Sequence, residues 1–154
     1  MNKKPCRLTM AGLAFLLICS HGNAEFMSLA SNKANIRKGP GTEYPVIWQA
    51  WRFTPFEILE LGNEWAKVKD FENDIGWIHQ SLLSDVSTVI VMGKFANIRK
   101  GPGLKHAVLW IAYRGYPLKV LDREEDWLKV SDGKKIKGWI FRTLVWGSTK
   151  EGGG

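Results

Sequence analysis

The chain has 154 residues, and its 22 Lys and Arg against 15 Asp and Glu give a formal charge of +7. This length allows one ordinary domain or two small ones. Both cysteines, Cys6 and Cys19, lie in the first twenty residues, so the composition excludes a disulfide framework for the rest of the chain.

Residues 1–24 have the features of an export signal. A head with three basic residues precedes an apolar run at 8–19, which is too short to span a bilayer comfortably, and small residues permit cleavage after Ala24. Ile18 in front of Cys19 disfavours lipidation, and an uncleaved membrane anchor is the alternative. We therefore expect a periplasmic or secreted protein with no integral membrane span after cleavage of its signal peptide.

The charge that remains after this segment is small. Without the first 24 residues, 19 Lys and Arg stand against 15 Asp and Glu. A mildly basic protein suits a polyanionic surface or wall polymer. Because an exported protein rarely meets nucleic acid, we expect no nucleic-acid partner.

The segment Ala-Asn-Ile-Arg-Lys-Gly-Pro-Gly occurs twice, at 34–41 and at 96–103, and the second copy follows the first by 62 positions. The same offset holds without a gap through Gly-Trp-Ile at 76–78 and 138–140. A repeat at fixed spacing indicates one folding unit made twice. The predicted segments are a signal peptide at 1–24, a first domain at 25–84, a β-strand connector at 85–95, a second domain at 96–147 and a disordered tail at 148–154.

Each unit is predicted to consist of short strands after a lead-in at residues 25–33, which Phe26 and Leu29 can pin. Shared positions at every second residue of 46–53 show the period of a strand. The predicted elements of the first unit are strands at 34–37, 46–53, 56–60, 65–69 and 75–78, a helical turn at 79–83 and a last short strand. Five or so short strands without helical periodicity predict an all-β fold, a small barrel or sandwich.

The two Gly-Pro-Gly corners are predicted to be structural turns. Pro fixes φ and lacks an N–H donor, and Gly permits positive φ. A phosphate cradle is the weaker alternative, because the turn lacks the length and the Lys-Ser/Thr ending of a P-loop. The turn residues are Gly39, Pro40 and Gly41 in the first unit and Gly101, Pro102 and Gly103 in the second.

The connector contains the run Thr-Val-Ile-Val-Met at 88–92, which is predicted to be a strand. Such an apolar strand would be an aggregation hazard if it were exposed. We therefore expect it to pair with one unit or to lie between both, with Trp146 as a packing candidate. All eight tryptophans follow the signal segment. We expect them to supply buried core area, which stabilises these small units in the absence of crosslinks.

Together these motifs resemble the bacterial SH3-like domain: Asn-Ile-Arg-x-Gly-Pro-Gly, Tyr-Pro-Val-Ile, Trp-x-Lys-Val and Gly-Trp-Ile followed four residues later by Leu. The first unit carries them at 35–41, 44–47, 65–68 and 76–82, and the second at 97–103, 108–109, 127–130 and 138–144. The second departs at His106-Ala107, where Tyr44-Pro45 stand in the first. The resemblance implies two tandem SH3-like small β-barrels of five to seven strands. It also implies a non-enzymatic binding role, often toward peptidoglycan or its peptides, in a family commonly appended to wall hydrolases.

The candidate ligand-binding side chains are aromatic residues and Arg around the first long loop and their copies. Aromatic faces stack on sugars or prolines, and Arg binds carboxylates, which the peptide stems of wall polymers offer. Arg37 is equally well explained as a brace of its own loop, and Trp65 as core support. The candidates are Arg37, Tyr44, Trp48, Trp51 and Trp65 in the first unit and Arg99, Trp110 and Trp127 in the second.

Catalysis and metal binding are disfavoured by the residues present. Beyond residue 24 there are two histidines, His79 and His106, neither of which repeats, and Ser81 beside His79 lacks an orienting acid. The acidic turns at 72–74 and 122–126 lack the spacing of a calcium loop. We predict a monomeric binding protein without enzymatic activity, cofactor or metal. Its expected partner is a cell-wall polymer or, alternatively, an envelope protein for which it is an adaptor.

Overall fold

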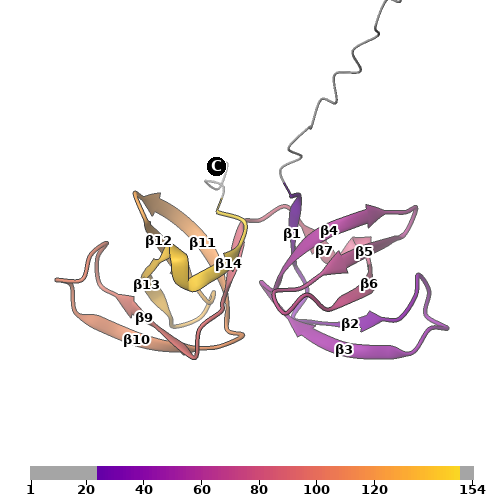
Figure 1. Cartoon of the computed structure of the whole chain (residues 1–154), viewed down its shortest axis with the longest axis horizontal. Helices are drawn as coiled ribbons and strands as arrows, with labels where there is room; N and C mark the ends of the chain where they lie inside the picture. The colour runs from indigo at the N-terminus through magenta and orange to yellow at the C-terminus, as the bar shows by residue number, and fades with distance from the viewer. Residues whose placement is uncertain (1–23, 150–154) are drawn as a thin grey trace, which may run out of the picture.

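The computed structural model of the chain describes residues 24–149 (Figure 1). They form an all-β structure with two seven-stranded antiparallel sheets, one from each half of the described chain. The predicted fold class of two tandem SH3-like barrels is confirmed. No helix among residues 24–149 is long and apolar enough to cross a membrane. The predicted signal peptide, apart from Ala24, lies outside the described residues, as do residues 150–154 of the predicted tail.

The first sheet has the strand order β3-β2-β6-β5-β4-β1-β7. A 3-10 turn, η1 (Gln80–Leu82), precedes its last strand, where a helical turn is predicted. Its strands are β1 (Phe26–Leu29), β2 (Lys33–Arg37), β3 (Val46–Trp51), β4 (Pro55–Leu61), β5 (Trp65–Lys69), β6 (Ile75–His79) and β7 (Leu83–Ser84).

The second sheet repeats this order as β10-β9-β13-β12-β11-β8-β14. Its 3-10 turn is η2 (Arg142–Leu144). Its strands are β8 (Thr88–Val91), β9 (Phe95–Arg99), β10 (Val108–Tyr113), β11 (Pro117–Glu124), β12 (Trp127–Ser131), β13 (Lys137–Phe141) and β14 (Val145–Gly147). Equal topology at a constant offset is what a duplicated folding unit requires.

The first strand of each sheet adds detail to the sequence analysis. The lead-in, for which no strand was named, contains β1, which pairs with β4 and β7 and so ties the lead-in to the first unit. The connector strand β8 is the equivalent of β1 and pairs with β11 and β14, which makes it part of the second sheet. Ser148, in the predicted tail, donates its backbone N–H to the Thr88 carbonyl at 3.0 Å.

Two hydrophobic cores fill the barrels, and the alternation along the strands explains both. In β2, Ala34 and Ile36 point inward while their neighbours point outward. The first core contains Leu29, Ala34, Ile36, Ala50, Phe56, Ala66, Val68 and Ile78. The second contains Val89, Val91, Ala96, Ile98, Ala112, Leu118, Val120, Leu128, Val130 and Ile140. Among the described residues no Trp is fully buried, and smaller side chains form the two core clusters, so the prediction that tryptophans supply the core area is wrong. Trp48 packs against the first core from its edge.

Both Gly-Pro-Gly corners are turns in equivalent settings, but the reason for their glycines differs from the predicted one. Neither Gly39 nor Gly101 has a positive φ. Instead, the ring of Tyr44 lies against Gly39, and a Cβ at Gly101 would lie 2.7 Å from Nδ1 of His106. The turns therefore need glycine because an aromatic ring from the same loop occupies the space of a side chain.

Candidate functional site

Each barrel has a groove, and the two grooves occupy equivalent positions of the repeat. The first groove, of about 370 Å³, is lined by Lys33, Asn35, Arg37, Thr42, Trp65, His79, Ser81 and Leu82. The second groove, of about 310 Å³, is lined by Phe95, Ala96, Asn97, Arg99, Leu104, Trp127, Phe141 and Leu144. Seven of the eight residues of the second groove lie 62 positions after a residue of the first, so the duplication has preserved the place of the groove.

The outward face of β2 forms the floor of the first groove. Lys33, Asn35 and Arg37 alternate with the two buried residues of this strand, so all three point away from the core. The first residue of β5, Trp65, and the last residue of β6, His79, add the aromatic wall, because these two residues are directly paired in the sheet. The groove therefore depends on the register of three neighbouring strands.

Arg37 closes the long loop that follows β2. Its Nη1 donates hydrogen bonds to the carbonyls of Thr42 at 3.0 Å and Tyr44 at 2.8 Å. Arg99 makes the same pair of bonds to Leu104 and His106, at 3.3 and 3.0 Å. In both units, therefore, the arginine holds the long loop in place through hydrogen bonds to its carbonyls. A guanidinium has five N–H donors, and Arg37 lines the groove while using Nη1 for the loop.

The aromatic wall of the first groove is Trp65 with His79, whose rings meet nearly edge to face at a centroid distance of 5.4 Å. Nδ1 of His79 accepts the backbone N–H of Ser81 at 3.3 Å and lies 2.7 Å from its hydroxyl. This contact caps η1, and it places the proton of the neutral imidazole on Nε2. His79 and Ser81 thus have a structural role at the groove.

The two grooves differ in chemistry at three equivalent pairs of positions. Lys33, Thr42 and His79 in the first groove are replaced by Phe95, Leu104 and Phe141 in the second. The shared residues are Asn35 and Asn97, Arg37 and Arg99, Trp65 and Trp127, and Leu82 and Leu144. The first groove therefore offers two cations, an imidazole and two hydroxyls beside an indole. The second offers an apolar surface with one cation.

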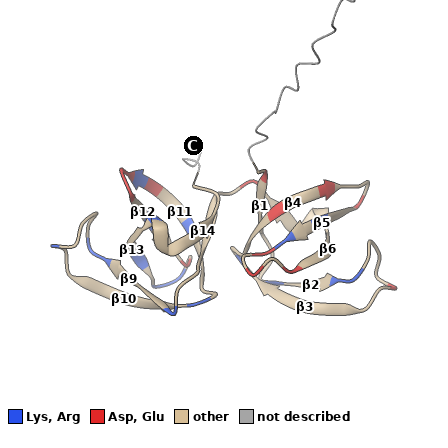
Figure 2. Ribbon diagram, in the orientation of Figure 1, with Lys and Arg blue, Asp and Glu red and all other residues tan. Residues whose placement is uncertain are grey.

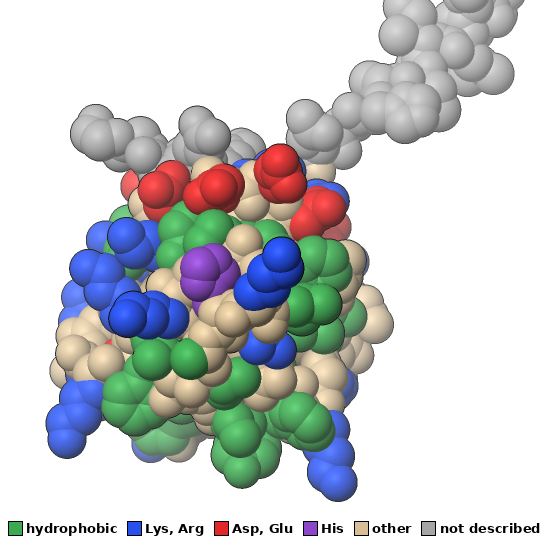
Figure 3. Space-filling view, turned by 90° about the vertical axis from the view of Figure 1, so that its left-hand side faces the viewer, with side chains coloured by type: hydrophobic (Ala, Val, Ile, Leu, Met, Phe, Trp, Pro, Cys, Tyr) green, Lys and Arg blue, Asp and Glu red, His purple; other side chains and the backbone are tan. Residues whose placement is uncertain are grey.

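The charge and apolar distribution of the surface agrees with this difference. Acidic residues gather on β4 and around the β11–β12 turn, whereas Lys and Arg lie on and after β2 and β9 (Figure 2). Hydrophobic side chains spread over the end of the second barrel, with Lys and Arg among them and acidic residues along one edge (Figure 3). Residues of the basic strands β2 and β9 line the two grooves.

The eight ligand-binding candidates predicted from the sequence fall into two groups in the structure. Arg37 and Trp65 lie in the first groove, and Arg99 and Trp127 in the second. Tyr44 packs on its own turn, Trp48 is partly buried against the first core, Trp110 is exposed on β10, and Trp51 lies between the barrels. These last four therefore do not join the groove.

Sequence reasoning missed Lys33, Asn35, Thr42 and His79 as lining residues. Two signals could have found three of them. Lys33 and Asn35 share the outward alternation of Arg37, and His79 stands opposite Trp65 in a β5–β6 pair whose register follows from the core residues Val68 and Ile78.

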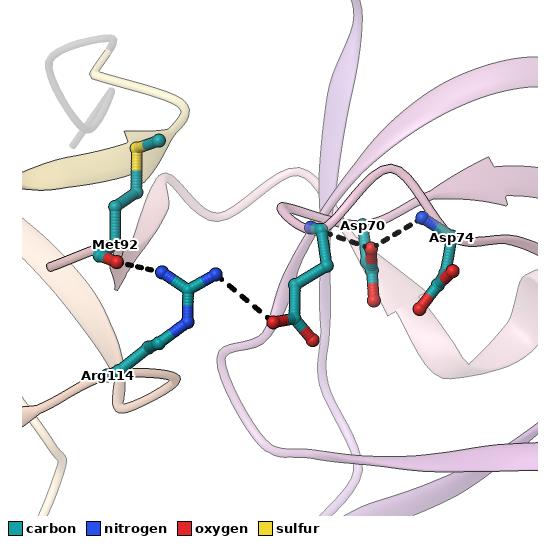
Figure 4. Close-up of polar contacts among 5 residues, drawn as sticks. Asp70, Asp74, Met92 and Arg114 are labelled. Atoms are coloured by element: carbon teal, nitrogen blue, oxygen red, sulfur yellow. Dashed lines mark hydrogen bonds and ion pairs between the residues drawn. The ribbon is translucent and has the colours of Figure 1, made fainter. Parts of the chain in front are cut away.

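Asp70, Glu72 and Asp74 bring three carboxylates within 4.8 Å of one another. Oδ1 of Asp70 accepts backbone N–H groups from Glu72 and Asp74, both at 2.9 Å, and Glu72 forms an ion pair with Arg114 of the second barrel (Figure 4). Partial burial raises the pKa of Asp70, while these two hydrogen bonds act in the opposite direction. The cluster thus shapes a turn and an interdomain contact, and we assign no metal to it.

Comparisons with known proteins identify the family of the chain. The family model described as bacterial SH3 domain matches residues 30–85 and again residues 92–147. Among curated proteins, the "Putative N-acetylmuramoyl-L-alanine amidase YrvJ" of Bacillus subtilis (strain 168) is 23% identical over 128 residues, which are 76% of this chain and 24% of that protein. The chain thus spans about a quarter of this relative.

Solved structures that match the chain include NlpC2 from Trichomonas vaginalis, which is 16% identical with a TM-score of 0.38 over 88% of this chain and 52% of that chain. An NlpC/P60 family protein from Bacillus cereus ATCC 10987 is 14% identical, with a TM-score of 0.38 over 79% of this chain and 55% of that chain. Each of these relatives is longer than the part that this chain matches.

Proposed function

The chain belongs to the bacterial SH3 domain family, and from this premise we propose that it is a non-enzymatic binding module of the cell envelope whose first groove recognises the peptide stems of peptidoglycan. The proposal includes a periplasmic or secreted location. It is supported by the amidase relative, since the bond named in N-acetylmuramoyl-L-alanine joins the sugar of the wall polymer to its peptide stem.

The observation that carries the proposal is the lining of the first groove. A peptide stem presents carboxylates, amides and small apolar side chains. Lys33 and Arg37 offer charge-assisted hydrogen bonds to a carboxylate. Oδ1 of Asn35 already accepts a hydrogen bond from Gln49 at 2.9 Å, which leaves its amide N–H groups as donors to a peptide carbonyl. The indole of Trp65 supplies an apolar face for methyl groups or for a sugar ring.

The second groove is less suited to such a ligand. It retains Arg99 and Trp127 but has phenylalanines where the first groove has Lys33 and His79. A carboxylate there would lose the second cation and would be desolvated by apolar side chains. We therefore assign wall recognition to the first groove.

Co-sedimentation with purified sacculi tests the proposal. The chain should pellet with sacculi more than an unrelated protein of equal charge does. Trp65→Ala should raise the apparent Kd about 30-fold, because loss of a central indole costs about 2 kcal/mol or more. Trp127→Ala is the matched control and should stay within about threefold of the parent. If the parent does not pellet, or if the Trp65 variant binds as the parent does, the proposal is wrong.

A second candidate function, an adaptor for another envelope protein, is favoured by the surface of β10. This strand is the edge of the second sheet and exposes Val108, Leu109, Trp110, Ile111 and Tyr113. An exposed apolar edge is a template for pairing with another chain. A chain that does not pellet with sacculi, but crosslinks in cells from Tyr113 to one dominant protein, would support the adaptor over the wall-binding module.

A further inference from the structure

The two barrels meet across a contact with approximate two-fold symmetry. Phe53 of the first barrel lies against Gly133 of the second, where a Cβ would be 3.1 Å from Cε2 of Phe53. Exchange of the barrels by the 62-residue offset converts this contact into Gly115 against Phe71, and a Cβ at Gly115 would indeed lie 3.8 Å from Cζ of Phe71. Paired contacts of this kind define an isologous interface, here within one chain.

The backbone conformation of Phe53 also indicates that its contact across the interface is important. Phe53 has φ of 70° and its equivalent, Gly115, has φ of 79°. Glycine adopts this left-handed conformation without strain, whereas a phenylalanine does so at a cost of order 1–3 kcal/mol. The ring of Phe53 packs across the interface against Gly133, and this packing compensates for the strain.

The charges at this interface break the symmetry. On one side, Nη2 of Arg114 lies 3.1 Å from Oε1 of Glu72 (Figure 4). The same guanidinium covers the ring of Phe71. The positions equivalent to Arg114 and Glu72 on the other side are Arg52 and Lys134, which are both cations. Within residues 24–149, neither of them takes part in an ion pair. The second side of the interface therefore lacks an acid equivalent to Glu72, which pairs with Arg114 on the first side.

A cavity of about 640 Å³ lies between the barrels on that second side. Arg52 and Lys134 both line it, together with Trp51 and Phe53 from the first barrel and Tyr116 and Asp132 from the second. Trp51 is 58% exposed, and Nζ of Lys33 lies 5.1 Å from the centroid of its ring. The cavity thus combines two cations with an accessible aromatic surface.

Asp132 is the acidic residue among the described lining residues, and its oxygens already have donors. Oδ1 accepts the backbone N–H groups of Lys134 and Ile136 at 2.8 and 2.9 Å, and Oδ2 accepts the hydroxyl of Tyr116 at 3.1 Å. Burial, together with the charge of Asp132, raises the pKa of Tyr116, so the phenol remains a donor at neutral pH. Asp132 is therefore occupied in shaping its turn and does not pair with either cation.

We propose that this interdomain cavity binds a carboxylate attached to an aromatic or apolar body. The guanidinium of Arg52 matches the geometry of a carboxylate, the ammonium of Lys134 adds a second donor, and Trp51 and Phe53 contact the apolar part. Two cations with Asp132 leave a formal charge of +1 in the lining, which balances a singly charged carboxylate better than a doubly charged phosphate. This site is distinct from the first groove and does not depend on wall binding.

N-acetylphenylalanine is a suitable probe, and its binding can be followed by the indole N–H signal of Trp51 in a two-dimensional NMR spectrum of the full chain. Trp51→Phe assigns that signal. The signal should shift in a saturable way with the carboxylate probe. N-acetylphenylalaninamide, which lacks the charge, and inorganic phosphate, which lacks the ring, should each bind at least tenfold more weakly. Equal affinity for acid and amide, or an equal shift with phosphate, would overturn the proposal.

The repeat itself supplies the decisive variant. Lys134→Glu places beside Arg52 the acid that Glu72 provides beside Arg114. The new glutamate should pair with Arg52, and the affinity for the probe should fall at least tenfold. Arg52→Gln should cause a similar loss of affinity. Glu72→Gln, on the side of the Arg114 ion pair, should leave the affinity within about twofold of the parent. If Lys134→Glu and Arg52→Gln both fold and bind the probe as the parent does, the assignment is wrong.

Discussion

Phe56→Ala should lower the free energy of unfolding of the first barrel by about 3–5 kcal/mol. Phe56 is 0% exposed and is the largest fully buried side chain among the described residues. It lies on β4 and belongs to the first core. Loss of its ring would leave a cavity between side chains that the sheet holds in place. A domain of about 60 residues buries only about 60% of its unfolded surface, so such a loss removes most of its stability.

Urea denaturation monitored by NMR measures this effect, because signals of the two barrels are separable. Leu59→Ala is the control on the same strand, since Leu59 is 42% exposed and should cost no more than about 0.5 kcal/mol. Signals of the first barrel should disappear at much lower urea in the Phe56 variant than in the control. Equal midpoints for the two variants would show that the core is not organised as described.

Conversion of the first groove into the second should weaken wall binding by about a hundredfold. The triple variant Lys33→Phe, Thr42→Leu and His79→Phe takes each replacement from the equivalent position of the second barrel, where the same fold already accommodates it. Hydrogen bonds to charged groups contribute about 1.5–3 kcal/mol each, so loss of the lysine and of polar partners is consistent with this size of effect.

The reverse conversion is the matched experiment. Phe95→Lys, Leu104→Thr and Phe141→His should give the second groove the lining of the first and raise the number of bound stem peptides per chain from one to two. Isothermal titration with a soluble muropeptide measures both affinity and stoichiometry. A parent that already binds two muropeptides with equal affinity would contradict the difference between the grooves.

The fold was largely predictable because the repeat and the strand alternation carry the same information. Ile36 and Ile98 point inward in both copies, as the alternation requires. β1 was missed because its four residues show no clear alternation. The sheet partners of β8 could not be predicted, since an apolar run does not reveal which strand it contacts. The tryptophans were misplaced because their apolar area suggests burial, whereas smaller side chains such as Ala66 and Val68 fill the interior.

The candidate site was predictable only where the copies agree. Arg37 and Trp65 belong to motifs that recur in both units, so the repeat drew attention to them. Lys33 and His79 are replaced by Phe95 and Phe141 in the second unit, so the repeat does not mark their positions. The interdomain contact was beyond sequence reasoning, because Glu72 and Arg114 are 42 residues apart and their pairing depends on how the barrels pack.

Of the two equivalent grooves, we expect only the first to recognise the peptide stem of the wall polymer. Titration of the full chain with a soluble muropeptide, observed through the indole N–H signals of Trp65 and Trp127, distinguishes the two grooves in one experiment. The Trp65 signal should shift in a saturable way, and the Trp127 signal should change little. Equal shifts of both signals, or a shift at neither, would show that the first groove is not the recognition site.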